Sequence, residues 1–338
     1  MVTNSNSRMS KSKQAYFDCE DTNLIVMILL NWNGMSIFYN KLPILKICLE
    51  NLDNLIYSNL KIVVVDANSS DNSVSYINSI KDRSKHEIRV IKTENIGWAH
   101  NNNVGIKYAF TNFKNIKHII LISNDILIYD NRFLEQLNKI ISNIKDVGFL
   151  GCKILGPDNK IQNSGLFVGL NTGLIGTYTD REEGYLKNNE YIVGAFLIIN
   201  ADALISVGLL DENYDMMGSE DTDIEERIRR KNYKSYYTDK IEVIHIGSAS
   251  TFSLKEDIKG RWDLKKLSYS FKRNHFVCLF RYYKHLVKHY FLYEFIRSFF
   301  GIKPYPHPKP LSEIRYNIKT LFNAYSNAKE NYSRQVIR

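Results

Sequence analysis

The chain of 338 residues is 44% hydrophobic and 24% charged, the balance of a globular protein with one large domain and an appendage, or with two domains. No apolar run approaches the roughly 18 residues that a membrane-spanning helix needs, and residues 1–20 lack the apolar core of a secretory signal. We therefore expect no spanning helix, a cytoplasmic location, and four scattered cysteines that remain free thiols.

The net charge of +9 is unevenly distributed along the chain. From residue 256 onward there are 17 Lys or Arg and 6 Asp or Glu, a balance of +11, so residues 1–255 carry 9 − 11 = −2. A basic tail behind a nearly neutral body predicts an anionic partner for the tail, either a membrane surface with anionic lipids or a nucleic acid.

Residues 1–20 are rich in Ser, Asn and Lys without an apolar period, and we expect them to be disordered. After them, short apolar runs alternate with helical periods, which predicts an α/β domain with a mostly parallel sheet and helices on both faces. The predicted strands are residues 24–30, 60–65, 88–91, 119–122 and 147–152, and the predicted helices are residues 42–55, 132–144 and two segments ending near residues 80 and 110.

The run Ile119–Ile122 is the predicted central strand, because it is short, fully apolar and ends abruptly in Ser123, Asn124 and Asp125. In open α/β sheets, ligands bind beyond the carboxyl ends of such strands. A turn stabilised by its own polar side chains is the alternative explanation. Two other predicted strands also end in polar residues, at Asn31 and at Asp66.

The segment Glu94–Asn103 leads into a predicted helix and contains four asparagines and a glycine. Amide side chains at the start of a helix add little to the packing of an apolar core. A helix amino terminus favours anions, and amides can hydrogen-bond a base or a ribose, so this segment predicts a ligand site.

The second half of the domain is less regular, since glycines spaced through residues 156–190 predict hairpins and a mobile loop. We expect strands at residues 191–199 and 236–246, and helices at residues 201–207 and 220–231. Ser219 is a candidate cap for the last helix, and the acids Glu220 and Asp223 also fit a capping pattern, so a structural role for them stays open.

Residues 254–300 have a helical period rich in aromatic and basic side chains. The stripe Arg273, Phe276, Phe280, Tyr283 and Val287 is compatible with a membrane-surface helix or with a helix packed on the preceding domain. Prolines between residues 304 and 310 interrupt this pattern, and a last helix is expected to about residue 328. We accordingly divide the chain into a disordered segment (1–20), a catalytic α/β domain (21–255) and a basic helical region (256–338).

The strand-end residues occur in a familiar order: Asn31-Trp32-Asn33-Gly34, Asp66-Ala67-Asn68-Ser69, Asn95-Ile96-Gly97-Trp98 with Asn103, Ser123-Asn124-Asp125, and Gly208-Leu209-Leu210-Asp211 followed by Glu220-Asp221-Thr222-Asp223. Over residues 22–250 this order resembles the family 2 glycosyltransferases of the GT-A fold, most nearly the rhamnosyltransferase-like branch. The resemblance implies a Rossmann-like sheet flanked by helices, with the tail as a C-terminal helical extension.

The resemblance also implies roles for individual residues. The positions that match the nucleotide-sugar site are Asn31, Asp66, Asn95, Gly97, Trp98, Asn103, Asn124 and Asp125. Asp125 matches the last acid of the family's Asp-x-Asp element, which holds Mg²⁺ or Mn²⁺, and His245 matches a histidine that helps to hold the metal. The chain departs from the family at Ser123, where an acid or asparagine is usual, and a structural histidine is an equal alternative for His245.

The implied reaction is an inverting transfer of a sugar from a dTDP- or UDP-linked donor to a hydroxyl of a glycan or lipid-linked glycan. Asp221 matches the general base that takes the hydroxyl proton, with Glu220 as second choice. We expect the enzyme at the inner face of the cell membrane, with the tail in peripheral contact with anionic lipid.

Three other functions share part of this pattern. A dinucleotide-dependent oxidoreductase lacks support because no Gly-x-Gly-x-x-Gly follows the first strand, and a sugar-nucleotide pyrophosphorylase would have a basic, glycine-rich loop where residues 31–36 carry no Lys or Arg. A catalytically inactive relative that binds glycans or partners stays open because of Ser123. For the tail, no nucleic-acid recognition motif is present, so nucleic acid is not the expected partner.

Overall fold

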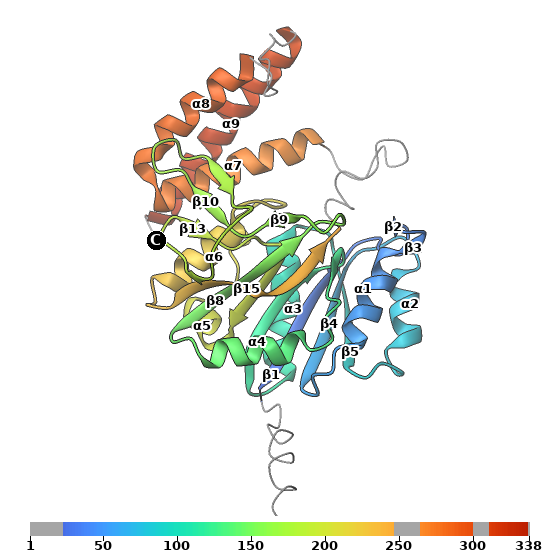
Figure 1. The fold of residues 1–338 in the computed structure, drawn as a ribbon. Helices are drawn as coiled ribbons and strands as arrows, with labels where there is room; N and C mark the ends of the chain where they lie inside the picture. The colour runs from blue at the N-terminus through green and yellow to red at the C-terminus, as the bar shows by residue number, and fades with distance from the viewer. Residues whose placement is uncertain (1–22, 247–263, 300–310, 337–338) are drawn as a thin grey trace, which may run out of the picture.

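The computed structural model describes residues 23–246, 264–299 and 311–336. The expected disorder of residues 1–20 and the proline-rich break at residues 304–310 lie outside these ranges. The described part is an α/β body with a helical projection at one end (Figure 1). No helix in these three ranges is both long and apolar enough to cross a membrane.

The body is built on one mixed sheet, whose main path through the described residues runs β12-β15-β8-β14-β6-β1-β4-β5. The strands on this path are β1 (Leu24–Asn31), β4 (Leu60–Ala67), β5 (Glu87–Thr93), β6 (Ile116–Ser123), β8 (Val147–Leu155), β12 (Gly184–Tyr185), β14 (Phe196–Asn200) and β15 (Lys234–His245). Two short strands pair with this sheet, β7 (Ile126–Leu127) with β15 and β9 (Ile161–Asn163) with β8. A small sheet is formed by β10 (Leu166–Val168), β11 (Ile175–Thr177) and β13 (Glu190–Tyr191), and a hairpin by β2 (Phe38–Tyr39) and β3 (Leu42–Pro43).

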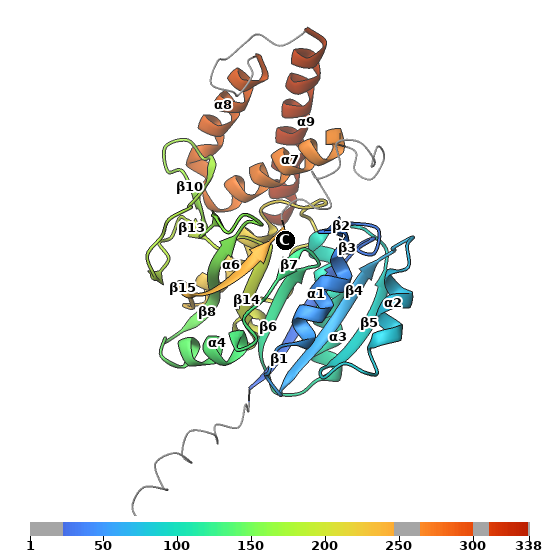
Figure 2. The ribbon, with the colours of Figure 1, turned by 45° about the vertical axis from the view of Figure 1, so that its right-hand side comes forward.

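Helices cover both faces of the sheet, as the alternation of strands and helices predicts (Figures 1 and 2). Successive side chains of β1 point to opposite faces, so Met27 packs under one set of helices and Ile28 under the other. One set is α1 (Ile44–Asp53), α2 (Ser73–Ile80) and α4 (Phe133–Ser142), and the other is α3 (Trp98–Asn112), α5 (Ala201–Val207) and α6 (Glu220–Arg229).

The prediction of parallel strands is confirmed in the first half of the sheet, where β6, β1, β4 and β5 are all parallel neighbours. In the second half, β14 runs antiparallel to both β6 and β8, and the short β12 runs antiparallel to β15. Because β8 and β15 are parallel to each other, the main path through the described residues is still mostly parallel, as predicted. The single strand expected over residues 191–199 is in fact two, β13 and β14, with residues 192–195 between them. This interruption places Gly194 beside the cleft described below.

The helical projection consists of α7 (Leu264–Tyr282), a 3-10 turn (Lys284–Leu286), α8 (Val287–Phe299) and α9 (Leu311–Val336). Helices α8 and α9 lie side by side and extend away from the sheet, while α7 lies at their base against the body (Figure 2). The stripe Phe276, Phe280 and Tyr283 is buried in a cluster shared with α9 and with Tyr191 and Tyr214 of the body. The packed alternative for this stripe is therefore the observed one.

Two basic side chains of the stripe region are also occupied inside the protein. Arg281 contacts Asp211 at 2.5 Å and the fully buried Asp223 at 2.7 Å. Lys272 forms an ion pair with Glu294 of α8. These contacts fasten α7 to the loop before α6, to α6 itself and to α8, and they remove part of the tail's charge from solvent.

Candidate active site

Polar side chains from three strand ends meet at the carboxyl edge of the parallel half-sheet. Asn31 pairs in register with Asp66, and its amide nitrogen donates to that carboxylate at 2.7 Å. Asn124, just after β6, donates from its side-chain amide to the side-chain oxygen Oδ1 of Asn31 at 2.8 Å. Asp66 accepts further bonds from the backbone and hydroxyl of Ser69, at 2.9 and 2.7 Å. The network fixes the loops after β1, β4 and β6 relative to one another.

Asp125 and His245 form a second polar group at this edge. Strand β7 pairs with the end of β15, opposing Ile126 to His245, and this brings His245 Nε2 to 3.3 Å from Asp125 Oδ2. On its other side, His245 Nδ1 lies 2.6 Å from Gln162 Oε1, a contact that holds the orientation of the imidazole ring. The other carboxylate oxygen, Asp125 Oδ1, is buried and has no hydrogen-bond partner among the described residues.

This pair suits a divalent cation. Carboxylate oxygens are ordinary ligands of Mn²⁺ and Mg²⁺, and Asp125 Oδ1 is buried without a partner among the described residues. The contact from His245 to Gln162 is the kind that orients a ligating imidazole. No cluster of three or more His, Cys, Asp or Glu suited to a metal occurs in the described ranges. The protein residues in these ranges thus fit only part of a coordination sphere, which oxygen atoms of a bound diphosphate and of water would complete.

The amino terminus of α3 forms the wall next to this edge. Gly97 precedes the helix with φ of 154°, and a Cβ there would lie 3.0 Å from the carbonyl oxygen of Met216, so the close approach of the two segments needs glycine. Asn101, in the first turn, is buried, and its Oδ1 has no partner among the described residues. An unpaired amide at a helix amino terminus is suited to a polar ligand.

Two adjacent acids, Glu220 and Asp221, open α6 on the opposite wall. Both oxygens of Asp221 accept backbone bonds, from Gly194 N at 2.9 Å and from Thr222 N at 2.7 Å. A Cβ at Gly194 would lie 2.9 Å from Asp221 Oδ2, so this approach also depends on glycine. Ser219 occupies the N-cap position without a side-chain cap bond, contrary to the capping prediction, because its φ of 68° directs the chain differently.

The pKa values of the two acids are shifted by different surroundings. Burial raises the pKa of Glu220 to about 8, with a further contribution from the neighbouring Asp221, and Glu220 Oε2 has no partner among the described residues. Burial also raises the pKa of Asp221, but the backbone N–H groups of Thr222 and Gly194 favour its ionised form. At pH 7 the proton of the pair therefore resides on Glu220.

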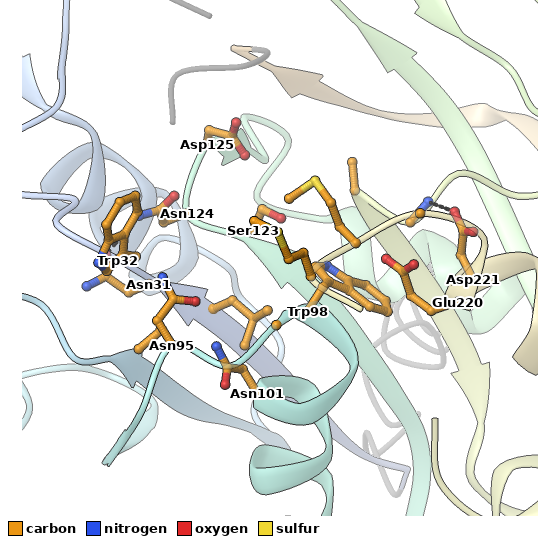
Figure 3. A pocket seen from close by; sticks show the side chains of 18 of the residues that line it. Asn31, Trp32, Asn95, Trp98, Asn101, Ser123, Asn124, Asp125, Glu220 and Asp221 are labelled. Carbon is orange, nitrogen blue, oxygen red and sulfur yellow. Dashed lines mark hydrogen bonds between the residues drawn. The ribbon is translucent and has the colours of Figure 1, made fainter. Parts of the chain in front are cut away.

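These groups line one cavity of about 330 Å³. Figure 3 shows Asn31, Trp32 and Asn124 on one side of it and Glu220 and Asp221 on the other. Apolar side chains complete the wall beside the acids: Trp98, Met216, Met217 and Phe271 of α7. The arrangement places amides with Asp125 and His245 at one end of the cavity, and the acids Glu220 and Asp221 at the other.

The model of the family described as "Glycosyl transferase family 2" matches residues 36–208, which is just over half of the chain. The chain belongs to glycosyl transferase family 2.

Among curated relatives, this glycosyltransferase is 23% identical over 252 residues to an uncharacterized protein, y4gI, of Sinorhizobium fredii, covering 71% of the chain and 26% of the relative. It is 27% identical over 145 residues to the O-antigen biosynthesis protein RfbC of Myxococcus xanthus, covering 39% of the chain and 11% of that protein. The chain thus spans about a quarter or less of the length of these relatives.

The solved structures that it resembles share its fold. A mannosyltransferase from Pyrobaculum calidifontis, in complex with GDP-Man and Mn²⁺, superimposes with a TM-score of 0.53 at 14% identity, over 94% of this chain and 80% of that one. S. aureus TarS 1-349, in complex with UDP-GlcNAc, gives 0.54 at 13% identity, over 92% of each chain. The predicted GT-A fold is confirmed by these similarities and by the family match.

Most residues that the sequence pointed to face the cavity of this family 2 glycosyltransferase, but two do not. Asp66 borders a neighbouring depression with Asn68 and Ser69. Asn103 lies away from the cavity, since its amide group bonds both the N–H and the carbonyl of Leu210 and the carboxylate of Glu212. Asn101, from the same run of asparagines, takes the place expected for Asn103.

Several lining residues carried no usable sequence signal. Gly194 and Met216–Gly218 lie in irregular segments, and Phe271 belongs to the tail that the sequence separates from the catalytic domain. For Asn101 the run of asparagines at residues 101–103 was the one sequence signal. Neighbouring positions point to different faces of a helix, so the run alone does not say which asparagine faces the cavity.

Proposed function

We propose that this protein transfers a sugar from a dTDP- or UDP-linked donor to a hydroxyl of a glycan or lipid-linked glycan, with inversion of the anomeric centre. The observation that carries the proposal is that one cavity has amides, Asp125 and His245 at one end and the acid pair at the other. Structural neighbours in complex with GDP-Man and UDP-GlcNAc, and a relative named for O-antigen biosynthesis, support this substrate class.

The donor would bind at the end near the strand tips. Asn31, which the bond to Asp66 orients, and Trp32 offer a hydrogen-bonding group and an aromatic face for the base. The diphosphate would lie between the amino terminus of α3 and Asp125, with Asn95, Gly97, Trp98, Asn101 and Asn124 around the nucleotide and sugar.

Asp125 and His245 would hold Mg²⁺ or Mn²⁺ beside the diphosphate. A bound cation stabilises the negative charge that develops on the departing diphosphate. Ser123, where the family usually has an acid or asparagine, lines the cavity but brings no carboxylate, so the protein supplies a weaker ligand set.

The acceptor hydroxyl would approach from the apolar wall formed by Trp98, Met217 and Phe271. Asp221 takes the hydroxyl proton, the hydroxyl oxygen forms the new bond to the anomeric carbon, and the bond from that carbon to the diphosphate breaks on the opposite face. Glu220, neutral at pH 7, adds no second charge to repel the diphosphate and can donate a hydrogen bond. A binding protein without activity has no need of this acid pair held at a glycine contact.

The tail would keep the enzyme at the cytoplasmic face of a membrane carrying lipid-linked acceptors. The buried stripe cannot serve this purpose, but α8 and α9 expose other apolar side chains, among them Leu292 (57% exposed), Ile296 (52%) and Leu311 (75%). The exposed bases Lys288 and Lys319 lie on the same helices. Basic residues beside apolar ones favour an anionic bilayer surface.

The experiment that tests the reaction compares the wild type with Asp221→Asn on a panel of nucleotide sugars. We expect donor hydrolysis or transfer with at least one donor, and a loss of about 10²- to 10⁴-fold in rate in the variant, the range of a general base. Binding of UDP or dTDP, measured by calorimetry, should stay nearly unchanged. No binding of any nucleoside diphosphate by the wild type, with or without Mn²⁺, would refute the donor site.

A further inference from the structure

The segment that presents the acid pair is an irregular loop, residues 213–219, which we call the acid-pair loop. It leads directly into Glu220 and Asp221, and Met216, Met217 and Gly218 of the loop line the cavity. Apart from a single bridge between Met216 and Gly97, it has no strand or helix pairing. Its shape therefore has to come from its neighbours.

The backbone of this loop is strained. Met216 and Ser219 have φ angles of 53° and 68°, in the left-handed region that side chains other than glycine disfavour, and Gly218 has a φ of 112°. Such conformations persist only where surrounding contacts impose them. Two bordering elements make those contacts, one on each side of the loop.

On one side, the N–H of Trp98 at the start of α3 donates to the carbonyl of Met216 at 2.7 Å. On the other side stands Asn274 of α7, which is fully buried. Its Nδ2 donates to the carbonyls of Asp215 at 2.7 Å and Met217 at 3.1 Å, and its Oδ1 accepts the N–H of Asp215 at 3.1 Å.

Arg273 completes this arrangement. Its guanidinium donates to Asn274 Oδ1 at 2.9 Å and also to the carbonyl of Asn213 in the acid-pair loop. The two donor and two acceptor positions of the Asn274 amide are then all used. A side chain buried in a helix with every bond directed to one strained loop and to the residue beside it serves to fix that loop.

We propose that Asn274 is a positioning residue for the acid pair: from α7 it holds the acid-pair loop in the strained conformation that directs Asp221 at the acceptor hydroxyl. The proposal rests on the glycosyl transfer proposed above. It makes α7 part of the catalytic unit, although the sequence places this helix in a separate basic tail. A displacement of about 1 Å at a reacting group lowers the rate by roughly 10²-fold, so loosening the loop has a large kinetic effect.

The test is Asn274→Ala in the full chain, with Lys272→Met as matched control. Lys272 lies on the same helix and forms an ion pair with Glu294 of α8, so its loss loosens the packing of α7 without touching the acid-pair loop. We expect Asn274→Ala to lower kcat by about 10²-fold with an unchanged dissociation constant for UDP, and Lys272→Met to keep kcat within about threefold. Equal kcat values in the two variants would overturn the proposal.

Two further measurements test the role of Asn274 independently of its effect on folding and on kcat. Hydrogen exchange of the Met216–Glu220 amides should accelerate in Asn274→Ala and not in the control, and this readout needs no substrate. If Asn274→Ala does not fold, Arg273→Lys keeps the charge but loses the forked contact, and it should show the same changes to a smaller degree. Unchanged exchange and kcat in both variants would refute the role of Asn274, whereas a wild type that binds no nucleoside diphosphate refutes the proposed function instead.

Discussion

Replacing Glu220 by Gln should stabilise the protein in a pH-dependent way. Glu220 is 6% exposed, and the pKa of its carboxyl rises from 4.5 to about 8 because burial and the adjacent Asp221 disfavour its charge. The folded state therefore holds the Glu220 proton more tightly than the unfolded state does. The stability that this proton contributes is complete below pH 4.5 and is lost as the pH rises through about 8.

The size of the effect follows from the same two values. At 1.36 kcal/mol per pKa unit, the rise from 4.5 to about 8 sets an upper limit of about 5 kcal/mol at pH 9, and of about 3 kcal/mol at pH 7. Gln is neutral at every pH, so the variant avoids the loss of stability that the wild type suffers when Glu220 ionises. Its advantage in the free energy of unfolding should be near zero at pH 4.5 and grow steadily toward pH 8.

Urea unfolding of the wild type and Glu220→Gln at pH 5, 7 and 9 measures this difference. Glu50→Gln, on the exposed side of α1, is the control for exchanging Glu and Gln as such. A stability difference that is the same at all three pH values would refute the assignment of a buried proton to Glu220. At pH 7 the variant should retain most of its transfer activity, because Glu220 is already neutral there; loss of activity comparable to that of Asp221→Asn would make Glu220 the base.

Three further predictions concern the metal pair, the glycine contact and the tail. Asp125→Ala should fold normally and bind UDP with the same affinity in Mn²⁺ and in EDTA, whereas the wild type binds more tightly in Mn²⁺; calorimetry decides this. Gly194→Ala should lower kcat while leaving UDP affinity unchanged, because the added Cβ would lie 2.9 Å from Asp221 Oδ2 and displace the carboxylate; steady-state kinetics would show an unaltered kcat if the contact is unimportant. Leu292→Ser with Ile296→Ser should weaken cosedimentation with anionic vesicles, and Ile205→Ser, an exposed site on α5, should not. Equal binding of all three proteins, or binding that is insensitive to salt, would refute attachment through α8.

The strand ends that line the amide-rich end of the cavity were predictable because their signal is local. An apolar run that stops at polar residues marks the carboxyl end of a buried strand, and parallel strands bring such ends to one edge. The register of β1 with β4 sets Asn31 opposite Asp66, so two residues that are 35 positions apart become hydrogen-bonded neighbours. The same logic placed Asn124 and Asp125 at this edge.

Other parts of the site depend on contacts that no local pattern contains. His245 reaches Asp125 because β7 pairs with β15, a pairing that no local pattern predicts, and only the family resemblance assigned both residues to one site. Asn101 and Asn103 are neighbours in a run of similar residues, yet one faces the cavity and the other binds the backbone of Leu210. The helical phase of α3, set by its apolar packing on β1 and β4, decides between them.

For the tail, charge and periodicity together could not predict whether its first helix binds a membrane or packs on the protein. A helix with aromatic and basic residues at helical spacing has the same sequence pattern on a bilayer and on a protein surface that carries buried acids. The acids that decide the matter, Asp211 and Asp223, lie 70 and 58 positions before Arg281, and they hold its guanidinium inside the fold. Truncation before α7 would take Arg281 away from the buried Asp223, which would keep its ion pair with Arg227, and it would expose the aromatic cluster. A chain shortened in this way would therefore report on unfolding of the acid-pair loop and not on membrane binding, which is why substitutions on the outer surface of α8 are the sharper test of the tail.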